Sequence, residues 1–375
     1  MGLTFEPLGK YVRQVDERNT NMVTESVLGI NIDKYFMPSV ANVIGTDLSN
    51  YKLLRKGRFA CNPMHVGRDG RLPVSRYTED TPAIVSPAYF MFEIIDENEI
   101  EPEYLMLCFR RPDFDRMCWF RTDASVRGGI TWDDVCALTI PVLSLPEQRK
   151  IVHDYQVITD RIELLRKMNE SLFSSATTAL RKIYSDESNL GEPVTLDSYC
   201  SQIVSGGTPS RTVDSFWTPA TIPWLKNGEV KNNIIISTEE CISEEGLAGS
   251  SARVVPKYTV NMAMYCVSDI QVSLSCIPLS TNQAVLNLST DSFRKACFLY
   301  YLLTAFGNDI TSQANGSAQQ NLSKEKIASF VFRSPKLENQ AFDFLETCMR
   351  YRIMLTKQIS VLMDLQSSML SLLSH

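Results

Sequence analysis

Two stretches decide the organisation of this chain: GGITWDDVCALTIPVLSLPEQ at 128–148 and GSAQQNLSKEKIASFVFRSPKLENQ at 316–340. Each begins with a glycine, continues through an apolar run, and ends in Glu and Gln before a long helical pattern. The second stretch follows the first by about 191 to 192 residues, which is half of the chain. Because a repeat of this size fixes the architecture before any single motif does, we predict the order domain, helix, domain, helix.

The helical pattern after each stretch has the spacing of a coiled coil, with apolar residues at alternating steps of four and three. Pro146 suits a first helical turn, and the turn-forming residues 185–193 end the first helix. We predict helices over about 146–184 and 336–373, each with one polar seam position, Asn169 and Gln358. The apolar seam positions are Ile151, Tyr155, Ile158, Ile162, Leu165, Leu172, Ala176 and Ala179 in the first helix, and Phe344, Cys348, Tyr351, Leu355, Leu362, Leu365, Met369 and Leu372 in the second.

The remaining sequence is expected to form two α/β domains, at 1–143 and 193–334, with helices and linkers at 144–192 and 335–375. A chain of 375 residues is too long for one core, because single cores rarely grow beyond about 250–300 residues. We therefore expect an α+β fold with a pseudo-two-fold internal repeat, in which two long helices form an antiparallel coiled coil between the domains. Predicted strands include 83–85, 89–92 and 234–236, and a helix is expected late in each domain, at 103–111 and 292–306.

Composition describes an ordinary globular protein: 44% of residues are hydrophobic and 21% are charged. The first residues lack a charged segment followed by an apolar one, and no apolar run reaches the roughly 18 residues that span a bilayer. We expect a cytoplasmic protein with no membrane partner.

Metal binding and catalysis find little support in the sequence. Ten cysteines are scattered without a CxxC pair, and several, such as Cys108 and Cys297, sit among apolar neighbours as small core residues do. We expect no zinc site and no catalytic residue. The chain has no GxxxxGK[ST] phosphate loop, no adenine-methylation string and no HExxH. Of the three histidines, only His65 lies where it could face a ligand, since His153 falls on the first long helix and His375 is last.

The net charge of −6 argues against a nucleic-acid partner, but its distribution does not. Seven Lys and Arg side chains between Lys52 and Arg76 face a single acid, Asp69, so this stretch carries +6. A basic loop can contact phosphates. The alternative is a solvated face paired with acids from elsewhere. The candidate DNA-binding residues of the first domain are Lys56, Arg58, Asn62, His65, Arg68, Arg71 and Arg76.

In the second domain, the string SGGTPSR at 205–211 predicts a loop whose glycine amides approach a phosphate, or else a plain turn before a strand. Residues 224–232 combine Trp224 with two cations and two amides, which can stack on bases, neutralise phosphates and hydrogen-bond adenine edges. The alternative is a buried Trp224. The candidate DNA-binding residues here are Gly206, Gly207, Thr208, Ser210, Arg211, Lys226, Asn227, Lys231, Ser251, Arg253 and Gln319.

These strings, taken in order, resemble a known family. SGGTPSR, then IPWLKNGEV at 222–230, ISEEGL at 242–247 and VP at 255–256 are similar to the target recognition domain of type I restriction-modification specificity subunits. In the first domain, IVSPAY at 84–89 and the stretch 128–148 resemble the same family. The similarity departs from the family at Leu337–Gln340, where a proline is common, and in the first domain, which lacks GGTPS.

The resemblance implies a subunit that reads DNA and catalyses nothing itself. It implies double-stranded DNA as ligand, two modification subunits that methylate adenine with S-adenosylmethionine, and two restriction subunits that use ATP and Mg. This chain would bind no cofactor. Two domains set apart by a helix of about 38 residues, roughly 57 Å long, would read a split target with an unread gap of fixed length. Two other functions stay open: a duplicated adaptor for protein or glycan, and a hydrolase with its site at the GGTPS loop.

Overall fold

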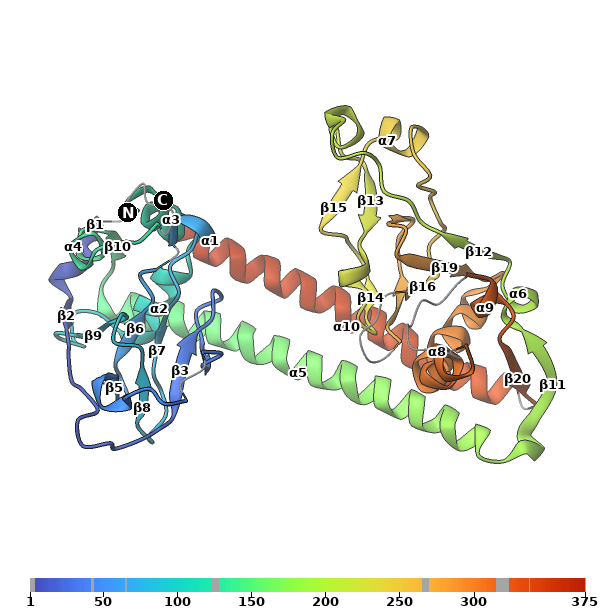
Figure 1. Ribbon diagram of the computed structural model, residues 1–375, viewed down its shortest axis with the longest axis horizontal. Coiled ribbons are helices and arrows are strands. Elements are labelled where there is room, and N and C mark those ends of the chain that lie inside the picture. Colours follow the sequence, from blue (N-terminus) through green and yellow to red (C-terminus); the bar gives the residue numbers. More distant parts are fainter. Residues whose placement is uncertain are drawn as a thin grey trace. The chain divides into compact units, whose positions relative to one another are not determined.

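The computed structural model describes residues 4–41, 44–64, 66–122, 128–264, 270–314, 324–336 and 338–374. The chain divides into two compact units (Figure 1). Unit 1 comprises Met1–Arg161 and Leu362–His375, and unit 2 comprises Ile162–Val361. Each unit therefore holds one α/β domain together with part of both long helices. Among the described residues, no helix is long and apolar enough to cross a membrane.

Unit 1 contains two four-stranded sheets. The first has the antiparallel order β2-β9-β6-β7, and α2 (Pro102–Arg110) buries Tyr104, Leu105 and Phe109 in the core cluster that includes this sheet. The second sheet has the order β4-β3-β8-β5, in which β3 and β8 are parallel. The strands are β2 (Val12–Gln14), β3 (Val27–Ile30), β4 (Phe36–Pro38), β5 (Lys52–Leu54), β6 (Phe59–Cys61), β7 (Val74–Arg76), β8 (Ala83–Val85) and β9 (Phe90–Ile94), and the other helices are α1 (Val66–Asp69), α3 (Pro112–Phe120) and α4 (Trp132–Cys136).

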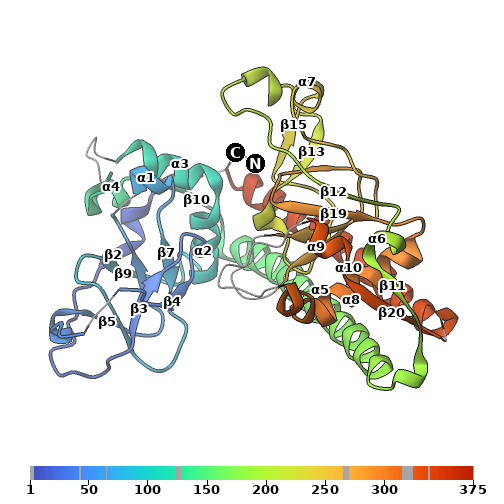
Figure 2. The same ribbon diagram turned by 45° about the vertical axis from the view of Figure 1, so that its right-hand side comes forward.

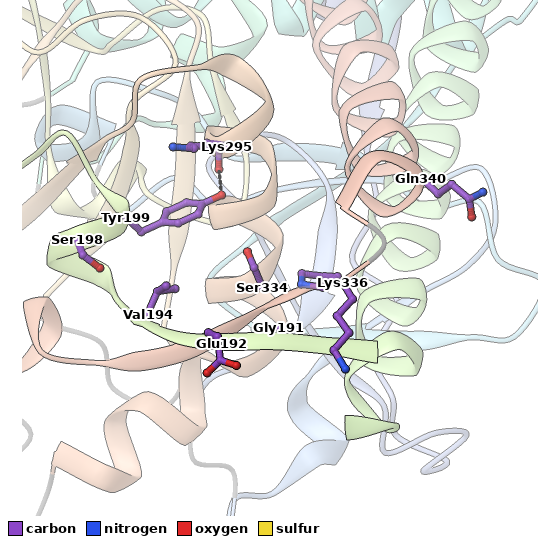
Figure 3. A pocket seen from close by; sticks show the side chains of 10 residues that line it. Gly191, Glu192, Val194, Ser198, Tyr199, Lys295, Ser334, Lys336 and Gln340 are labelled. Atoms are coloured by element: carbon purple, nitrogen blue, oxygen red, sulfur yellow. Dashed lines mark hydrogen bonds between the residues drawn. The ribbon is translucent and has the colours of Figure 1, made fainter. Parts of the chain in front are cut away.

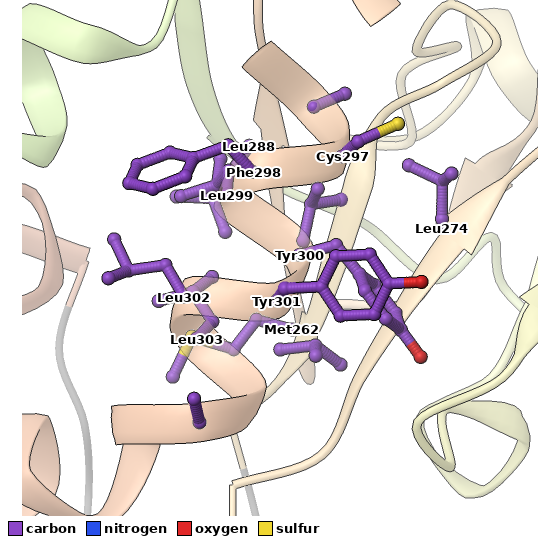
Figure 4. Close-up of a cluster of buried hydrophobic side chains, with 14 of the residues drawn as sticks. Met262, Leu274, Leu288, Cys297, Phe298, Leu299, Tyr300, Tyr301, Leu302 and Leu303 are labelled. Carbon is purple, nitrogen blue, oxygen red and sulfur yellow. The ribbon is translucent and has the colours of Figure 1, made fainter. Parts of the chain in front are cut away.

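Unit 2 contains a five-stranded sheet of order β12-β19-β16-β17-β14 and a three-stranded sheet of order β15-β13-β18. Figure 2 labels β12 and β19 of the first sheet and β13 and β15 of the second. The helix α8 (Phe293–Ala314) packs on β16 and β17, and its run from Cys297 to Leu303 forms the centre of the core in Figure 4. The strands are β12 (Gln202–Ser205), β13 (Ile222–Leu225), β14 (Ile234–Ile235), β15 (Glu240–Ile242), β16 (Val260–Ala263), β17 (Val272–Ser275), β18 (Ser280–Thr281) and β19 (Val285–Ser289), and a short helix α7 spans Glu244–Ala248.

The two units repeat one topology, as the sequence predicted. The order β2-β9-β6-β7 in unit 1 matches β12-β19-β16-β17 in unit 2. In the second sheets, the parallel pair β3 and β8 matches the parallel pair β13 and β18, and each has an antiparallel neighbour, β4 or β15. The strand β9 leads into α2 just as β19 leads into α8. The repeat therefore extends from the junction motifs to the whole domain.

The junction motifs themselves form a small sheet in front of each long helix. In unit 1, β1 (Thr4–Pro7) pairs antiparallel with β10 (Thr139–Val142), and in unit 2, β11 (Leu190–Thr195) pairs with β20 (Val331–Pro335). A short helix precedes the second strand of each pair, α4 or α9 (Lys324–Ala328), and α6 (Leu196–Tyr199) follows β11. Gln148 is fully buried at the start of the first long helix. Its side-chain Nε2 donates to the backbone carbonyls of Glu99 and Leu143, and its Oε1 accepts from the backbone amide of Glu101. This explains the LPEQ string, because Gln148 anchors the helix start to the domain.

The two long helices are α5 (Leu145–Tyr184) and α10 (Glu338–Leu372), within two residues of the predicted bounds. They run antiparallel within each unit. In unit 2, Asn169 on α5 bonds to Arg352 and Thr356 on α10, and in unit 1 Gln366 donates to Thr159. The predicted seam of α5 is confirmed: all eight apolar positions are buried or half-buried, and Ile162 and Leu165 are at most 4% exposed.

The predicted seam of α10 is right at half of its apolar positions: Cys348 and Leu355 are buried, and Leu362 and Met369 are half-buried. Phe344, Tyr351, Leu365 and Leu372 are 44% to 74% exposed, and Gln358 is also exposed. The buried face carries Leu345, Met349, Arg352 and Leu355, and further on Leu373. Arg352 and Gln366 occupy inward positions, and a pattern based on apolar spacing assigns such polar residues to solvent. This is why the sequence placed the other half of the seam one residue too early.

Two buried arginines hold α10 in place. In unit 1, Arg111 is fully buried, donates to the carbonyl of Leu373 (2.7 Å) and lies 3.2 Å from the Asp113 carboxylate. In unit 2, Arg352 is 4% exposed and donates to Asn169 (2.8 Å), to the Tyr300 hydroxyl (3.1 Å) and to the carbonyl of Asn232 (3.3 Å). Both side chains tie the helix to the domain of their own unit.

Candidate nucleic-acid interface

The basic stretch of unit 1 is neutralised in the folded chain. Each of its seven cations has a carboxylate within 4.0 Å, and six of these ion pairs reach outside the stretch. The carboxylate of Glu17 forms ion pairs with both Arg55 (2.8 Å) and Arg58 (2.6 Å). Arg55 and then Arg58 hold the pKa of Glu17 below its ordinary value. The remaining pairs are Lys52–Asp16, Lys56–Asp80, Arg68–Asp69, Arg71–Asp33 and Arg76–Glu103. The structure thus favours the alternative of a surface paired with acids from elsewhere.

The candidate residues of this stretch differ in exposure. Lys56, Arg68 and Arg71 are more than half exposed, whereas Arg58 and Arg76 keep 16% and 22% of their side-chain surface. Asn62 is half-buried, and its side chain accepts from the amide of Met64. His65 lies outside the described residues. The exposed cations can reach a DNA phosphate only in competition with their acidic partners.

The two glycines of the SGGTPSR string serve the packing of unit 2. The amides of Gly206 and Gly207 donate to the carbonyls of Val285 (3.2 Å) and Thr281 (2.8 Å). A Cβ on Gly206 would lie 2.2 Å from the carbonyl oxygen of Thr281, and one on Gly207 would lie 2.3 Å from Ser251 Oγ. The expectation that these two amides bind a phosphate is therefore wrong, because both hydrogens are already used inside the fold.

Arg211, at the end of the string, forms a clamp with two tryptophans. Its guanidinium lies 3.6 Å from the ring centre of Trp217 and 5.2 Å from that of Trp224, and it pairs with Glu240 at 2.6 Å. The indole nitrogens donate back to the string, Trp217 to the carbonyl of Ser210 and Trp224 to that of Gly207, each at 3.0 Å. Trp224 is 2% exposed, as the alternative of a buried tryptophan predicted. Arg211 itself stays half exposed despite these contacts.

Lys226 is also paired. Its ammonium lies 2.7 Å from Glu239 and 3.0 Å from Glu240, and these carboxylates raise the pKa of Lys226 above its ordinary value. Arg211 and then Lys226 lower the pKa of Glu240. Two cations and two carboxylates therefore meet around β13 and β15 with no excess charge.

The other candidates of unit 2 lie on exposed loops. Thr208 bonds to Gln283, Ser210 shares a hydrogen bond with Thr212 at 2.9 Å, and Asn227 is half-buried at the start of a 3-10 turn. Lys231, Ser251 and Arg253 are exposed. Among the described residues, neither Lys231 nor Arg253 has a carboxylate within ion-pair distance, so both can neutralise a phosphate. Gln319 lies outside the described residues.

Sequence reasoning missed two exposed arginines of unit 1, Arg110 and Arg116. They too have no carboxylate within ion-pair distance among the residues that the structure describes. The signal that could have indicated them is Arg110-Arg111-Pro112, a short basic run that a proline separates from the next helix.

A cavity of about 810 Å³ in unit 2 contains none of the candidate residues (Figure 3). It lies beside β11 and β20 and is lined by Glu192, Tyr199, Lys295 and Lys336 among others. Lys295 pairs with Asp291 at 2.8 Å. In the described ranges, no three His, Cys, Asp or Glu side chains gather as metal ligands would, and nine free cysteines are present. Cys108 and Cys297 are fully buried, as their apolar neighbours predicted.

The duplicated topology and its helix pair are the fold of type I restriction-modification specificity subunits. A crystal structure of the S subunit of a type I restriction-modification system from M. genitalium superimposes with a TM-score of 0.56 at 14% identity. The match covers 99% of this chain and 95% of that one. A chain from a study of complex assembly in the type I R-M system matches 99% of this chain and 97% of its own, with a TM-score of 0.46 and 14% identity.

The sequence leads to the same family. Residues 192–362 match the family model described as type I restriction modification DNA specificity domain. A 140-residue alignment at 24% identity relates this chain to the Type I restriction enzyme EcoR124I/EcoR124II specificity subunit of Escherichia coli. The alignment covers 36% of this chain, and the chain spans about a third of the length of that relative (35%). Residues 192–362 thus match a type I restriction modification DNA specificity domain, and the fold of the chain is similar to that of the M. genitalium S subunit.

Proposed function

We propose that this chain directs a type I restriction-modification complex to its DNA target and catalyses no reaction itself. The observation that carries the proposal is the internal repeat: two domains of one topology, of which the second matches a DNA specificity domain. Exposed Lys231, Arg253 and Arg211 in unit 2 supply cations for phosphate contact. We place the protein in the cytoplasm, where its DNA would be.

The target is a split sequence in which each domain reads one half. The shared topology of the two domains supports the proposal that both bind DNA in the same way. Their different loops support the proposal that they read different half-sites. In unit 2 the connection between β12 and β13 carries GGTPSR and the Arg211 clamp, whereas residues 15–26 of unit 1, between β2 and β3, contain no such string. Base-reading residues lie on such connections, because a loop can change without disturbing the sheets.

The two long helices set the length of the unread gap. A helix of 40 residues, such as α5, is about 60 Å long at roughly 1.5 Å per residue. At about 3.4 Å per base pair, this length corresponds to roughly 18 base pairs of B-DNA. Both helices continue from one unit into the other, so the proposed spacer is made of both together.

The partners are two modification subunits and two restriction subunits, which bind S-adenosylmethionine, ATP and Mg. The adenine must leave the base stack to reach the pocket of a modification subunit, and that step belongs to the partner. The helix pair offers a docking surface, because apolar side chains that are 44% to 74% exposed lie on both helices. These are Val157, Leu164, Met168, Phe344, Tyr351, Met354, Val361, Met363, Leu365 and Leu372.

Methylome sequencing of a bacterial host that expresses this chain with its modification subunits tests the proposal. We expect adenine methylation at one motif of two short half-sites separated by a gap of fixed length. The same host without this chain is the control and should lack the motif. Methylation of an unbroken motif, or no new methylation together with capture of a protein or glycan by the chain, would contradict the proposal.

A further inference from the structure

A small cationic pocket of about 430 Å³ lies in unit 1, outside the candidate residues of the basic stretch except for Arg71. It is enclosed by the turn between β3 and β4, the turn after α1, and the junction of α2 and α3. Its charged lining consists of four cations, Lys34, Arg71, Arg110 and Arg116, and two carboxylates, Asp33 and Asp115.

The floor of the pocket is a buried ion pair. Lys34 is 5% exposed, and its ammonium donates to Asp115 (2.6 Å) and to the carbonyl of Leu72 (2.9 Å). Asp115 also accepts from the amide of Leu72 at 3.1 Å. Lys34 has a φ of +67°, which is uncommon for a residue with a side chain, so the turn is held by these contacts. The ion pair leaves the floor neutral and fixes α3 to the β3–β4 turn.

The rim carries the excess charge. Arg71 pairs with Asp33 at 2.9 Å, and both side chains are more than half exposed. Arg110 ends α2 and Arg116 lies in α3, and both are exposed. Within the described residues, neither Arg110 nor Arg116 has a carboxylate within ion-pair distance. The pocket therefore differs from the basic stretch 52–76, in which every cation is paired, because it carries two uncompensated positive charges.

Two guanidinium groups that have no carboxylate within ion-pair distance in the described part of the chain, beside a fixed polar floor, suit a phosphodiester. Guanidinium groups bind phosphate oxygens through two parallel hydrogen bonds, and they do so without losing their charge at any physiological pH. The exposed Arg71–Asp33 pair can open so that Arg71 adds a third cation, since an exposed pair is worth at most about 1 kcal/mol.

We propose that this pocket binds the phosphodiester backbone of the DNA read by unit 1, with Arg110 and Arg116 as the direct phosphate ligands. The inference rests on the proposed function and deepens it, because it replaces the paired stretch as the main phosphate contact of this unit. A backbone contact carries no sequence information, so its loss weakens binding to every duplex alike and leaves the half-site unchanged.

The test is the salt dependence of duplex binding by the full chain, followed by fluorescence anisotropy with a labelled duplex of random sequence. Each lost phosphate contact reduces the slope of log K against log salt by about 0.9. Arg110→Gln and Arg116→Gln should each give this reduction, and the double variant about 1.8. Arg13→Gln is the matched control, because Arg13 is an exposed arginine of the same unit that is paired with Glu93 at 2.7 Å and lies outside the pocket.

The outcomes separate the two proposals. If the wild-type chain binds no duplex, even with modification subunits present, both proposals fail. If the wild-type chain binds with a steep slope that Arg110→Gln and Arg116→Gln leave unchanged, the pocket is refuted and the proposed function stands. The proposal for the pocket is also refuted if Arg13→Gln reduces the slope of log K against log salt as much as Arg110→Gln and Arg116→Gln do. It is refuted as well if these variants lose binding of the modification subunits and keep binding of DNA. Thermal melting that matches the wild type shows that the variants fold.

Discussion

The substitution Gly207→Ala tests whether the glycines of SGGTPSR serve the fold or the DNA. The new Cβ would lie 2.3 Å from Ser251 Oγ, 2.4 Å from the amide nitrogen of Ala252 and 2.5 Å from the carbonyl carbon of Ser251. Two of these three atoms belong to backbone, so the loop must move. The movement breaks the bonds from the Gly207 amide to Thr281 and from the Trp224 indole to the Gly207 carbonyl.

Overpacking costs about 1–3 kcal/mol, and each lost hydrogen bond adds about 0.5–1.5 kcal/mol. We expect unit 2 to lose about 2–6 kcal/mol of unfolding free energy, which corresponds to a fall in Tm of roughly 4–24 °C for a unit of this size. Urea and thermal unfolding of the full chain measure both. Gly228→Ala is the matched control: a Cβ there meets no atom within 4 Å, and a change within about 0.5 kcal/mol is expected.

A Gly207→Ala chain that melts with the wild type but has lost its affinity for duplex DNA would refute this reasoning. The glycine would then be needed where the loop meets the phosphate, as the sequence first suggested. A chain that unfolds early and binds normally at low temperature fits the packing role.

Three further predictions concern the helices and the clamp. Arg111→Ala should destabilise unit 1 by about 3–5 kcal/mol, because it removes the ion pair with Asp113 and the hydrogen bond to the Leu373 carbonyl. Equal rates of amide hydrogen exchange at the end of α10 in the variant and the wild type would contradict this prediction. The pKa of Glu240 is lowered in the folded chain. The stability that Glu240 contributes is therefore fully present above the ordinary pKa of 4.5, and it is lost as the pH falls through the lowered pKa. The difference in unfolding free energy between the wild type and Glu240→Gln should therefore shrink from pH 7 to pH 3. A constant difference would contradict the ion pair between Arg211 and Glu240. One added heptad in both α5 and α10 adds about 10.5 Å and should widen the unread gap of the methylated motif by about 3 base pairs, with both half-sites unchanged. An altered half-site would contradict the proposal that the helices set only the gap length.

Local patterns predicted the repeat, the helix bounds and the seam of α5, because these depend on residues close together in sequence. Half of the predicted seam of α10 failed, because Arg352 and Gln366 occupy buried or half-buried positions where apolar spacing requires an apolar residue. Their partners, Asn169 and Thr159, lie 183 and 207 residues away. No local signal connects them.

The candidate site was less predictable, because net charge along a stretch does not show which acids fold against it. Glu17 and Arg55 are 38 residues apart in sequence, and only the sheets bring them together. Arg110 and Arg116, which have no ion-pair partner among the residues that the structure describes, were missed for the same reason, because an unpaired charge depends on which distant residues fold against it. The role of Trp224 as a packed residue was weighed correctly because a tryptophan between apolar residues is usually buried.

Exchange of residues 193–334 for the corresponding domain of a type I specificity subunit is the most direct test of the proposal that two domains read DNA independently. Methylome sequencing of a host that expresses the exchanged chain with the modification subunits gives the new target. We predict that one half-site changes to that of the donor, while the other half-site and the gap length stay as in the wild type. A change in both half-sites, or in neither, would contradict the account.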